Sequence, residues 1–196
     1  MNEIILASNN QNKLREIKQK LAKFNINVIS QKEAGIDIDV EETGKTFKDN
    51  AIIKAEAIYN IVKKPVLADD SGLEIDYLDG APGVYSHRFC PGSDEDRYNK
   101  ALKLLEGVPE EKRTARYRCA VCFIDENGKK HIFEDKAEGI IGLEPKGTNG
   151  FGFDPIVISI EKGQTFAELS PEEKNEISHR GKAIAKFVQY IESVVE

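Results

Sequence analysis

The chain opens with a short apolar segment, a polar loop and an amphipathic segment. Residues Ile4 to Ala7 predict a buried strand, and the polar run Ser8 to Lys13 follows it. Apolar side chains then recur at helical spacing and predict one buried stripe, made of Leu14, Ile17, Leu21 and Phe24. Asn9 or Asn10 can cap this helix, whose N-terminus would favour an anion beside Lys13. The alternative is an ordinary capped helix.

The same patterns predict the other elements of a mixed α/β fold. Further strands are expected over Ile26 to Ser30, Ala115 to Ile124 and Lys130 to Ile140, and the last two are joined through an Asn-Gly hairpin signal. Helices are expected after the capping residues Thr46, Ser93 and Ser170, and a last helix should bury Ile184, Phe187, Val188, Ile191 and Val195. This order predicts a single domain over residues 1–196, with a long sheet and a cleft between two lobes.

One segment joins an apolar strand directly to hard ligands. The run Pro65 to Ala68 predicts a strand, and Asp69, Asp70, Ser71 and Gly72 follow it. Side chains alternate along a strand, so the two carboxylates should face opposite sides. Carboxylate oxygens at a strand end suit Mg²⁺, which commonly accompanies phosphate. The alternative is an Asx-type turn that merely ends the strand.

Composition narrows the classes of partner. The 196 residues are 40% hydrophobic, enough for a buried core, and their formal net charge is −6. This charge argues against a nucleic acid polymer as partner, although a local cluster of cations can still bind a small anion. No run has the length and apolarity of a membrane span, and we expect a cytoplasmic protein without a membrane partner. Cys119 and Cys122 should lie on opposite faces of a strand as buried structural residues.

An acidic pair precedes an incomplete phosphate-binding motif. The run Gly44-Lys45-Thr46 is similar to the end of a P-loop, but Asp39 stands where that motif requires glycine, which excludes it. Glu41 or Glu42 can instead supply an oxygen to Mg²⁺ and complement Asp70. An acidic surface loop is the alternative.

Two groups of polar side chains lie on predicted helices. Asn50 and Lys54 stand one turn apart, so they can face one ligand. Lys174 and the run Ser178 to Gly181 place donors around a helix boundary, where a carbonyl oxygen or a phosphate could be bound. A surface or capping role is the alternative for His179.

A glycine-rich segment from Thr148 to Pro155 surrounds an aromatic side chain. Glycines on either side of Phe151 would let the backbone approach a flat ligand on which the ring could stack. Asp154 could then accept hydrogen bonds from the N–H groups of a base. The alternative is a turn with a core phenylalanine.

Seven short motifs stand in one order along the chain, from Ser8 to Ala183. They are Ser8-x-Asn10-x-x-Lys13, Glu42-Thr43-Gly44, Asn50-Ala51-x-x-Lys54-Ala55, Ala68-Asp69-Asp70-Ser71-Gly72-Leu73, Gly80-x-Pro82-Gly83-x-Tyr85-Ser86, Gly150-Phe151-Gly152-x-Asp154-Pro155 and Ser178-His179-Arg180-Gly181-x-Ala183. Together they resemble the Ham1/RdgB family of inosine and xanthosine triphosphate pyrophosphatases. Each motif is short, but seven in sequence are highly specific.

The resemblance implies a reaction and an architecture. The reaction is Mg²⁺-dependent hydrolysis of non-canonical purine nucleoside triphosphates, namely dITP, ITP and XTP, to the monophosphate and pyrophosphate, which cleanses the nucleotide pool. The architecture is a homodimer of α/β chains, each with an elongated mixed β-sheet flanked by helices and an active-site cleft between two lobes.

The resemblance also implies roles for particular residues. The phosphate-binding loop falls on Ser8, Asn9, Asn10, Gln11, Asn12 and Lys13. Glu42 and Asp70 are the implied metal ligands, Asp70 is also the catalytic residue, and Ser71 contacts the substrate. Base recognition falls on Phe151, Gly152, Phe153, Asp154, Lys174, His179 and Arg180. Together with Mg²⁺, Lys13 and Lys54 could neutralise the charge of the triphosphate.

Two departures and two alternatives accompany this interpretation. Phe153 stands where many relatives are expected to have tyrosine, and the segment Ser86 to Pro91 differs from the common form with small residues.

A Maf-like nucleotide pyrophosphatase acting on other modified bases is one alternative, and the His179-Arg180 pair argues against it. A nucleotide sensor without turnover is the other, and the presence of both Glu42 and Asp70 argues against it.

Overall fold

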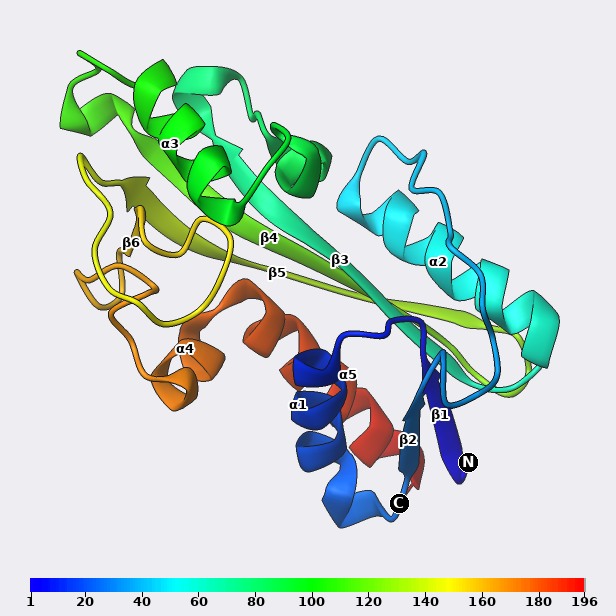
Figure 1. The fold of residues 1–196 in the computed structure, drawn as a ribbon. Helices are drawn as coiled ribbons and strands as arrows, with labels where there is room; N and C mark the ends of the chain where they lie inside the picture. The colour runs from blue at the N-terminus through cyan, green and yellow to red at the C-terminus, as the bar shows by residue number, and fades with distance from the viewer. Residues whose placement is uncertain (196) are drawn as a thin grey trace. The chain divides into compact units, whose positions relative to one another are not determined.

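The structure, a computed structural model, describes residues 1–195. Figure 1 shows its strands and helices in chain order. The strands are β1 (Glu3–Leu6), β2 (Asn27–Ser30), β3 (Val66–Ile75), β4 (Thr114–Ile124), β5 (Lys130–Ile141) and β6 (Val157–Ser159). The helices are α1 (Gln11–Leu21), α2 (Phe47–Val62), α3 (Asp94–Leu104), α4 (Pro171–Ile177) and α5 (His179–Val195). Among the described residues, no helix combines the length and the apolar character needed to cross a membrane.

The strands of residues 1–195 form one sheet in the order β2-β1-β3-β4-β5-β6. Strand β1 runs parallel to both β2 and β3, with Ile5 opposite Ile29 on one side and Val66 on the other. Strand β6 is antiparallel to β5. The predicted Asn-Gly turn joins β4 to β5 and is closed by a 3.0 Å hydrogen bond from the Asp125 N–H to the Lys129 carbonyl. The predicted mixed α/β class is confirmed.

Helix caps explain why several helices begin where the sequence predicts. Asn10 caps α1 and Thr46 caps α2 through their side-chain oxygens. Ser93 and Ser170 each form a capping box with the acid three residues later. These side chains satisfy the N–H groups that a helix start leaves without partners, so the boundaries follow from local chemistry.

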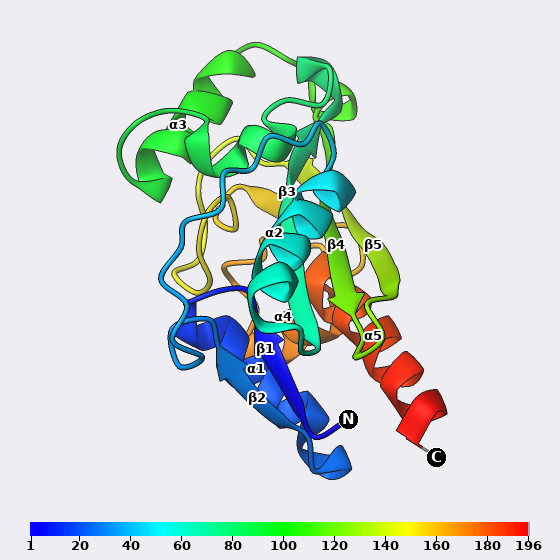
Figure 2. The ribbon, with the colours of Figure 1, turned by 90° about the vertical axis from the view of Figure 1, so that its right-hand side faces the viewer.

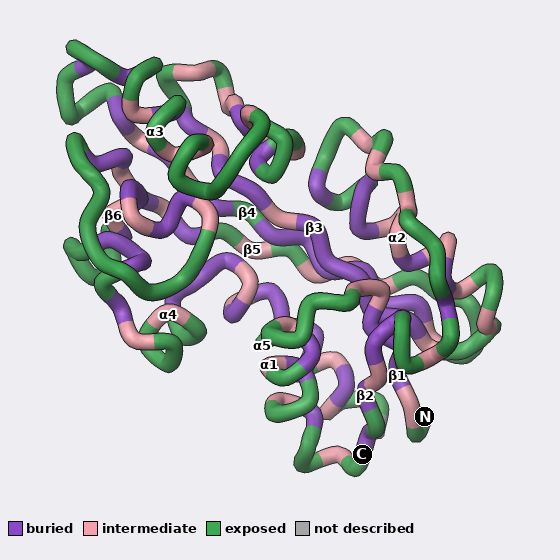
Figure 3. The backbone as a smooth tube through the Cα atoms, viewed as in Figure 1, coloured by how far each residue is buried: buried purple, intermediate pink, exposed green. Residues whose placement is uncertain are grey.

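The chain forms two compact units. The first contains Met1–Asp70, Cys119–Glu134 and Ala183–Glu196, and the second contains Ser71–Arg118 and Asp135–Lys182. Strands β3, β4 and β5 each contribute residues to both units. Figure 3 shows buried residues concentrated on the strands of each unit.

The first unit packs helices on both faces of its strands. Apolar side chains of α1 and α5 form one core cluster with residues of β1 to β4. Helix α2 lies on the other face of β3 (Figure 2), and its Asn50 and Lys54 side chains contact Asp70. Cys119 and Cys122 are both buried, and Cys119 belongs to the cluster under α1 and α5. The predicted structural role of both thiols agrees with this burial.

Strand β3 corrects one detail of the sequence interpretation. The strand does not end at Asp69 but continues to Ile75, so the two aspartates lie inside a strand and not in a turn. Within the first unit, Leu67 and Asp69 face the side of α1, whereas Asp70 faces α2. The predicted alternation of the two carboxylates is therefore confirmed.

The second unit has a core of its own. It contains buried side chains of α3 and of β3 to β6, together with the segment that leads to α4, including Phe153 and Phe166. Tyr117 of β4 packs edge-on against Phe166, with ring centroids 5.4 Å apart. This core fixes the backbone that carries the glycine-rich segment.

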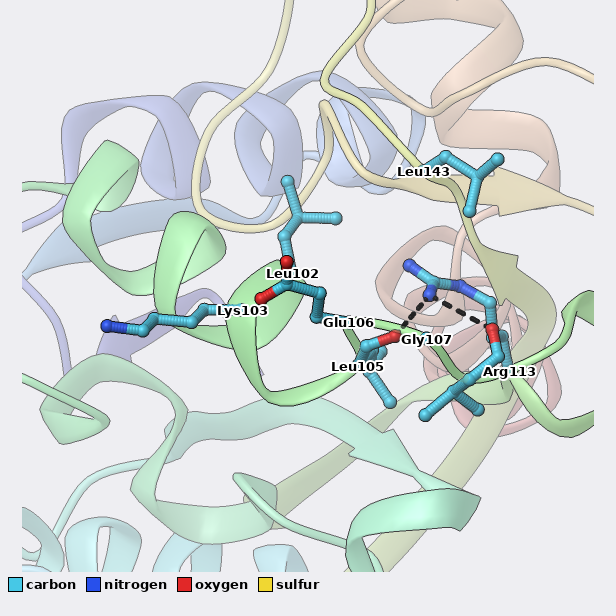
Figure 4. A pocket seen from close by; sticks show the side chains of 8 residues that line it. Leu102, Lys103, Leu105, Glu106, Gly107, Arg113 and Leu143 are labelled. Carbon is cyan, nitrogen blue, oxygen red and sulfur yellow. Dashed lines mark hydrogen bonds between the residues drawn. The ribbon is translucent and has the colours of Figure 1, made fainter.

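A buried arginine closes one end of this core (Figure 4). Arg113 is 3% exposed, and its guanidinium donates to the carbonyls of Leu105, Ile141 and Gly142 at 2.7 to 2.8 Å. It lines a surface hollow with Leu102 and other side chains, among them none of the residues expected to bind substrate. Burial lowers the pKa of Arg113. Its carbonyl partners belong to the end of α3 and the end of β5, so Arg113 ties these two elements together.

Replacing Arg113 with methionine should lower the free energy of unfolding by about 2 to 3 kcal/mol, because buried carbonyls would lose their donor. The stem of methionine still fills much of the space. Urea denaturation followed by circular dichroism measures the loss. Arg118→Met is a suitable control because the Arg118 side chain is 50% exposed and makes only a 3.8 Å ion pair to Glu74. An equal loss in both variants would contradict the structural role of Arg113.

Candidate functional site

The loop before α1 is ordered by its own polar side chains. Asn10 Oδ1 accepts from the N–H groups of Asn12 at 2.9 Å and Lys13 at 3.2 Å. Ser8 Oγ accepts from the Asn10 N–H at 3.1 Å, and Asn9 Oδ1 accepts from the Lys32 N–H at 3.0 Å. The predicted cap is confirmed, and the loop presents a helix N-terminus at which an anion is favoured. The Gln11 side chain donates to the carbonyl of Asn9 at 3.4 Å.

Lys13 brings a cation to this loop and is held by Asp69. Its Nζ atom lies 2.8 Å from both carboxylate oxygens of Asp69. Asp69 is 8% exposed, whereas the Lys13 side chain is 20% exposed. The carboxylate therefore fixes the direction of the lysine, while the ammonium keeps a path to an incoming anion.

On the other face of β3, two carboxylates approach one ammonium group. Lys54 Nζ lies 2.5 Å from Glu42 Oε1 and 3.8 Å from Asp70 Oδ1. The Asp70 side chain is 6% exposed and that of Glu42 is 28% exposed. Two acids from distant parts of the sequence thus meet at a point where a cation already lies. Glu42, and not Glu41, is the member of the predicted acidic pair that reaches Lys54.

This arrangement fits a Mg²⁺ site. Mg²⁺ is commonly bound by one or two carboxylates, with phosphate oxygens and water as its remaining ligands. Glu42 and Asp70 supply two hard oxygen donors, and both carboxylates lie near the Nζ atom of Lys54. A divalent cation close to this position could therefore contact both. Among residues 1–195, no group of three or more His, Cys, Asp or Glu side chains is placed to hold a metal ion.

Asn50 fixes the orientation of Asp70. The Asn50 amide is fully buried; its Oδ1 accepts from the Gly44 N–H at 2.7 Å and its Nδ2 donates to Asp70 Oδ2 at 3.0 Å. A Cβ at Gly44 would lie 2.6 Å from Asn50 Oδ1, so this close approach requires glycine. The Glu-Thr-Gly motif and the helix that follows it are therefore linked to Asp70 through one side chain.

Lys54 keeps its charge in this setting. Burial alone would lower the pKa of Lys54, but the neighbouring carboxylates of Asp69, Asp70 and Glu42 outweigh burial and raise it above its usual value. The first unit thus places the ammonium groups of Lys13 and Lys54 and the carboxylates of Glu42 and Asp70 beside one strand. Such a set can bind a polyphosphate and its divalent cation.

The second unit gathers the residues expected to recognise a base. The Phe151 ring is 51% exposed, with Lys174 Nζ 4.3 Å and the Arg180 guanidinium carbon 5.7 Å from its centroid. Arg180 also donates to Ser71 Oγ at 3.1 Å. An exposed aromatic face beside two cations suits a flat, electron-rich ring that carries carbonyl oxygens.

Asp154 is a buried carboxylate that binds both Phe151 and Lys174. It is 3% exposed and accepts from the Tyr117 hydroxyl at 3.0 Å, from the Phe151 N–H at 2.9 Å and from the Lys174 ammonium. These contacts are to protein groups, and the contact of Asp154 with a base stays a prediction. A Cβ at Gly150, where φ is +77°, would lie 2.1 Å from Asp154 Oδ2, so the turn requires glycine.

The two aromatic residues of the glycine-rich segment have different surroundings. Phe153 is 5% exposed and packs in the core, 6.3 Å from the Phe89 ring, whereas Phe151 is exposed. The structure therefore places Phe153, which we expected among the base-binding residues, beneath the segment. Gly152 lies at the surface, and its N–H donates to Asp94 Oδ2 at 2.7 Å. Asp94 belongs to α3 and has no motif that would have pointed to it.

Tyr117 is the most informative residue that sequence reasoning missed. Its ring stacks on the ring of His179, with centroids 4.7 Å apart and planes at 14°. The alternating pattern of β4 marks Tyr117 only as a buried residue. The signal available in the sequence was that a buried tyrosine needs a partner for its hydroxyl.

Comparison with known proteins places the chain in a family. The Ham1 family profile matches residues 4–190. A Clostridium perfringens protein named dITP/XTP pyrophosphatase is 44% identical, with all of both chains covered, and one of the same name from Bacillus licheniformis is 48% identical over 95% of this chain and 96% of its own. The structure of a HAM1 protein from Coxiella burnetii superposes with a TM-score of 0.92 at 42% identity, over 98% of this chain and 100% of that one. The chain belongs to the Ham1 family.

Proposed function

We propose that this chain hydrolyses the non-canonical purine nucleoside triphosphates dITP, ITP and XTP to the monophosphate and pyrophosphate, with Mg²⁺ as cofactor. The observation that carries the proposal is the approach of Glu42 and Asp70 to one cation, the ammonium group of Lys54, in the same unit as the capped N-terminus of α1. Relatives 44% to 48% identical to this chain and named dITP/XTP pyrophosphatase support the choice of substrate.

In the proposed reaction, the first unit binds the triphosphate. The amides at the start of α1 and the ammonium groups of Lys13 and Lys54 would bind phosphate oxygens. Glu42 and Asp70 would hold Mg²⁺, which would offset phosphate charge and make a water molecule more acidic. Asp70 orients the attacking water and accepts its proton at a carboxylate oxygen, while Asn50 keeps that carboxylate fixed through the 3.0 Å hydrogen bond.

The second unit supplies the proposed selection of the base. Lys174 and Arg180 are hydrogen-bond donors beside the exposed face of Phe151. Donors of this kind favour the 6-oxygen of hypoxanthine and xanthine, whereas the 6-amino group of adenine would leave them without an acceptor. Such a mismatch can discriminate strongly between bases.

A panel of triphosphates tests this function. We expect pyrophosphate and the monophosphate from ITP, dITP and XTP in the presence of Mg²⁺, and little turnover of ATP or GTP. Because guanine shares the 6-oxygen, the rejection of GTP would have to come from contacts around position 2 of the base. Chromatography of the nucleotides with a separate assay for pyrophosphate and orthophosphate identifies the products. Adding a chelator should stop the reaction. Orthophosphate as the first product, or no turnover of any member of the panel, would refute the proposal.

The homodimer that the family resemblance implies is also proposed for this chain. Sedimentation equilibrium distinguishes a dimer from the 21.9 kDa monomer.

A further inference from the structure

Tyr117 contacts two of the residues that we assign to base recognition. It is 6% exposed, so its side chain cannot serve as a broad binding surface. Its hydroxyl donates to Asp154 Oδ1, and its ring lies flat against the ring of His179. One side chain from β4 thus supports a residue of the glycine-rich segment and a residue at the start of α5.

The hydroxyl contact fixes the carboxylate of Asp154. Tyr117 donates to Oδ1, whereas the Phe151 N–H and Lys174 donate to Oδ2. A carboxylate bound at both oxygens cannot rotate without losing a hydrogen bond. The position of Asp154 then determines where the Phe151 backbone and the Lys174 ammonium lie. Burial and the charge of Asp154 raise the pKa of Tyr117 well above its usual value, so the hydroxyl remains a donor.

The ring contact fixes the plane of His179. The rings of Tyr117 and His179 are nearly parallel, with centroids 4.7 Å apart. Each ring covers a face of the other, so tilting either ring would lose part of this contact. Phe166 meets the Tyr117 ring edge-on at 79° and is fully buried. Tyr117 is therefore held in the core by its contact with Phe166, and the ring of His179 packs against this fixed side chain.

We propose that Tyr117 is a positioning residue for purine recognition, which acts through Asp154 on Phe151 and Lys174 and through ring stacking on His179. The proposal rests on the proposed function, since it assigns Tyr117 to the base end of the substrate. It predicts that changes at Tyr117 weaken the binding of the base and leave the phosphate end unaffected.

The experiment compares two substitutions with a matched control. Tyr117→Phe removes the hydroxyl and keeps the ring, and Tyr117→Leu removes both contacts. Tyr77→Phe is the control, because Tyr77 is 52% exposed and also belongs to the second unit. For each protein, KM and kcat are measured with ITP, and Ki is measured for inorganic triphosphate, which has no base. Calorimetric binding of ITP without a metal gives a readout that does not need turnover.

We expect Tyr117→Phe to raise KM and the ITP dissociation constant by about three- to tenfold, the effect of losing one ordinary hydrogen bond, with kcat within about twofold. Tyr117→Leu should raise them further, and Ki for inorganic triphosphate should stay constant in both. Thermal unfolding shows whether Tyr117→Leu folds. If Tyr117→Leu does not fold, the ITP affinity of Tyr117→Phe alone tests the role of Tyr117.

Unchanged ITP affinity in Tyr117→Phe would overturn the inference, as would an equal rise in Ki for inorganic triphosphate or an equal effect in Tyr77→Phe. A wild-type protein that binds ITP without hydrolysing it would refute the proposed reaction alone, since the affinities would still test Tyr117. A wild-type protein that binds no ITP would refute both.

Discussion

Asp70→Asn should reduce the turnover of ITP by about 10² to 10⁴-fold, the range that positioned acid–base groups contribute. Asparagine cannot accept the proton from the attacking water, and it is a weaker ligand for Mg²⁺ than a carboxylate. The binding of the nucleotide should change much less, because the phosphate-binding loop and the residues assigned to the base keep their contacts. Initial rates of pyrophosphate release and calorimetric affinity for ITP give the two quantities.

The contacts of Asn50 should keep the side chain at position 70 in place after this substitution. The Gly44 N–H donates to Asn50 Oδ1, so the amide of Asn50 must turn its Nδ2 toward position 70. An asparagine there can accept that hydrogen bond through its own Oδ1, and the shape of the site is kept. Asp37→Asn, an exposed acid of the same unit, controls for the loss of one charge. Near-normal turnover in Asp70→Asn would overturn the role of Asp70.

Asp154→Ala should lower the free energy of unfolding by about 3 to 5 kcal/mol, because the substitution breaks a buried ion pair from one side. The side chains of Asp154 and Lys174 are 4% and 16% exposed, so both charges are shielded from water. The buried Tyr117 hydroxyl would lose its acceptor as well. The affinity for ITP should also fall by about tenfold or more, since Phe151 and Lys174 would no longer be held.

Guanidinium denaturation of this variant gives the change in stability, and ITP calorimetry at a temperature where it is folded gives the change in affinity. Glu144→Gln is the control, because its side chain is 72% exposed and 3.6 Å from Lys146. We expect the control to change stability by about 0.5 kcal/mol at most. A loss of similar size in both variants would show that the Asp154 contacts contribute little.

Local chemistry explains which parts of this fold could be predicted from sequence. Asn10, Thr46, Ser93 and Ser170 cap their helices with their own side chains, so the starts of these helices are encoded within four residues. The apolar stripe of α1 follows from helical spacing in the same way. The seven motifs indicated the family because their order along the chain is more specific than any one motif.

Partners that are distant in sequence explain what could not be predicted. Asp69 and Asp70 were expected to end a strand, yet β3 continues because Lys13 and Asn50 supply partners from 56 and 20 residues away. Periodicity could not tell which of Phe151 and Phe153 is exposed, since Gly152 between them has a positive φ and breaks the alternation. The link from Tyr117 to Asp154 spans 37 residues and leaves no local pattern.

The central claim is that Glu42 and Asp70 bind the divalent cation that accompanies the triphosphate. Anomalous diffraction from crystals grown with Mn²⁺ and a non-hydrolysable ITP analogue locates that cation directly. The account predicts a manganese peak about 2 Å from a carboxylate oxygen of each residue, in contact with phosphate oxygens. A peak that touches the phosphates but neither carboxylate would contradict it.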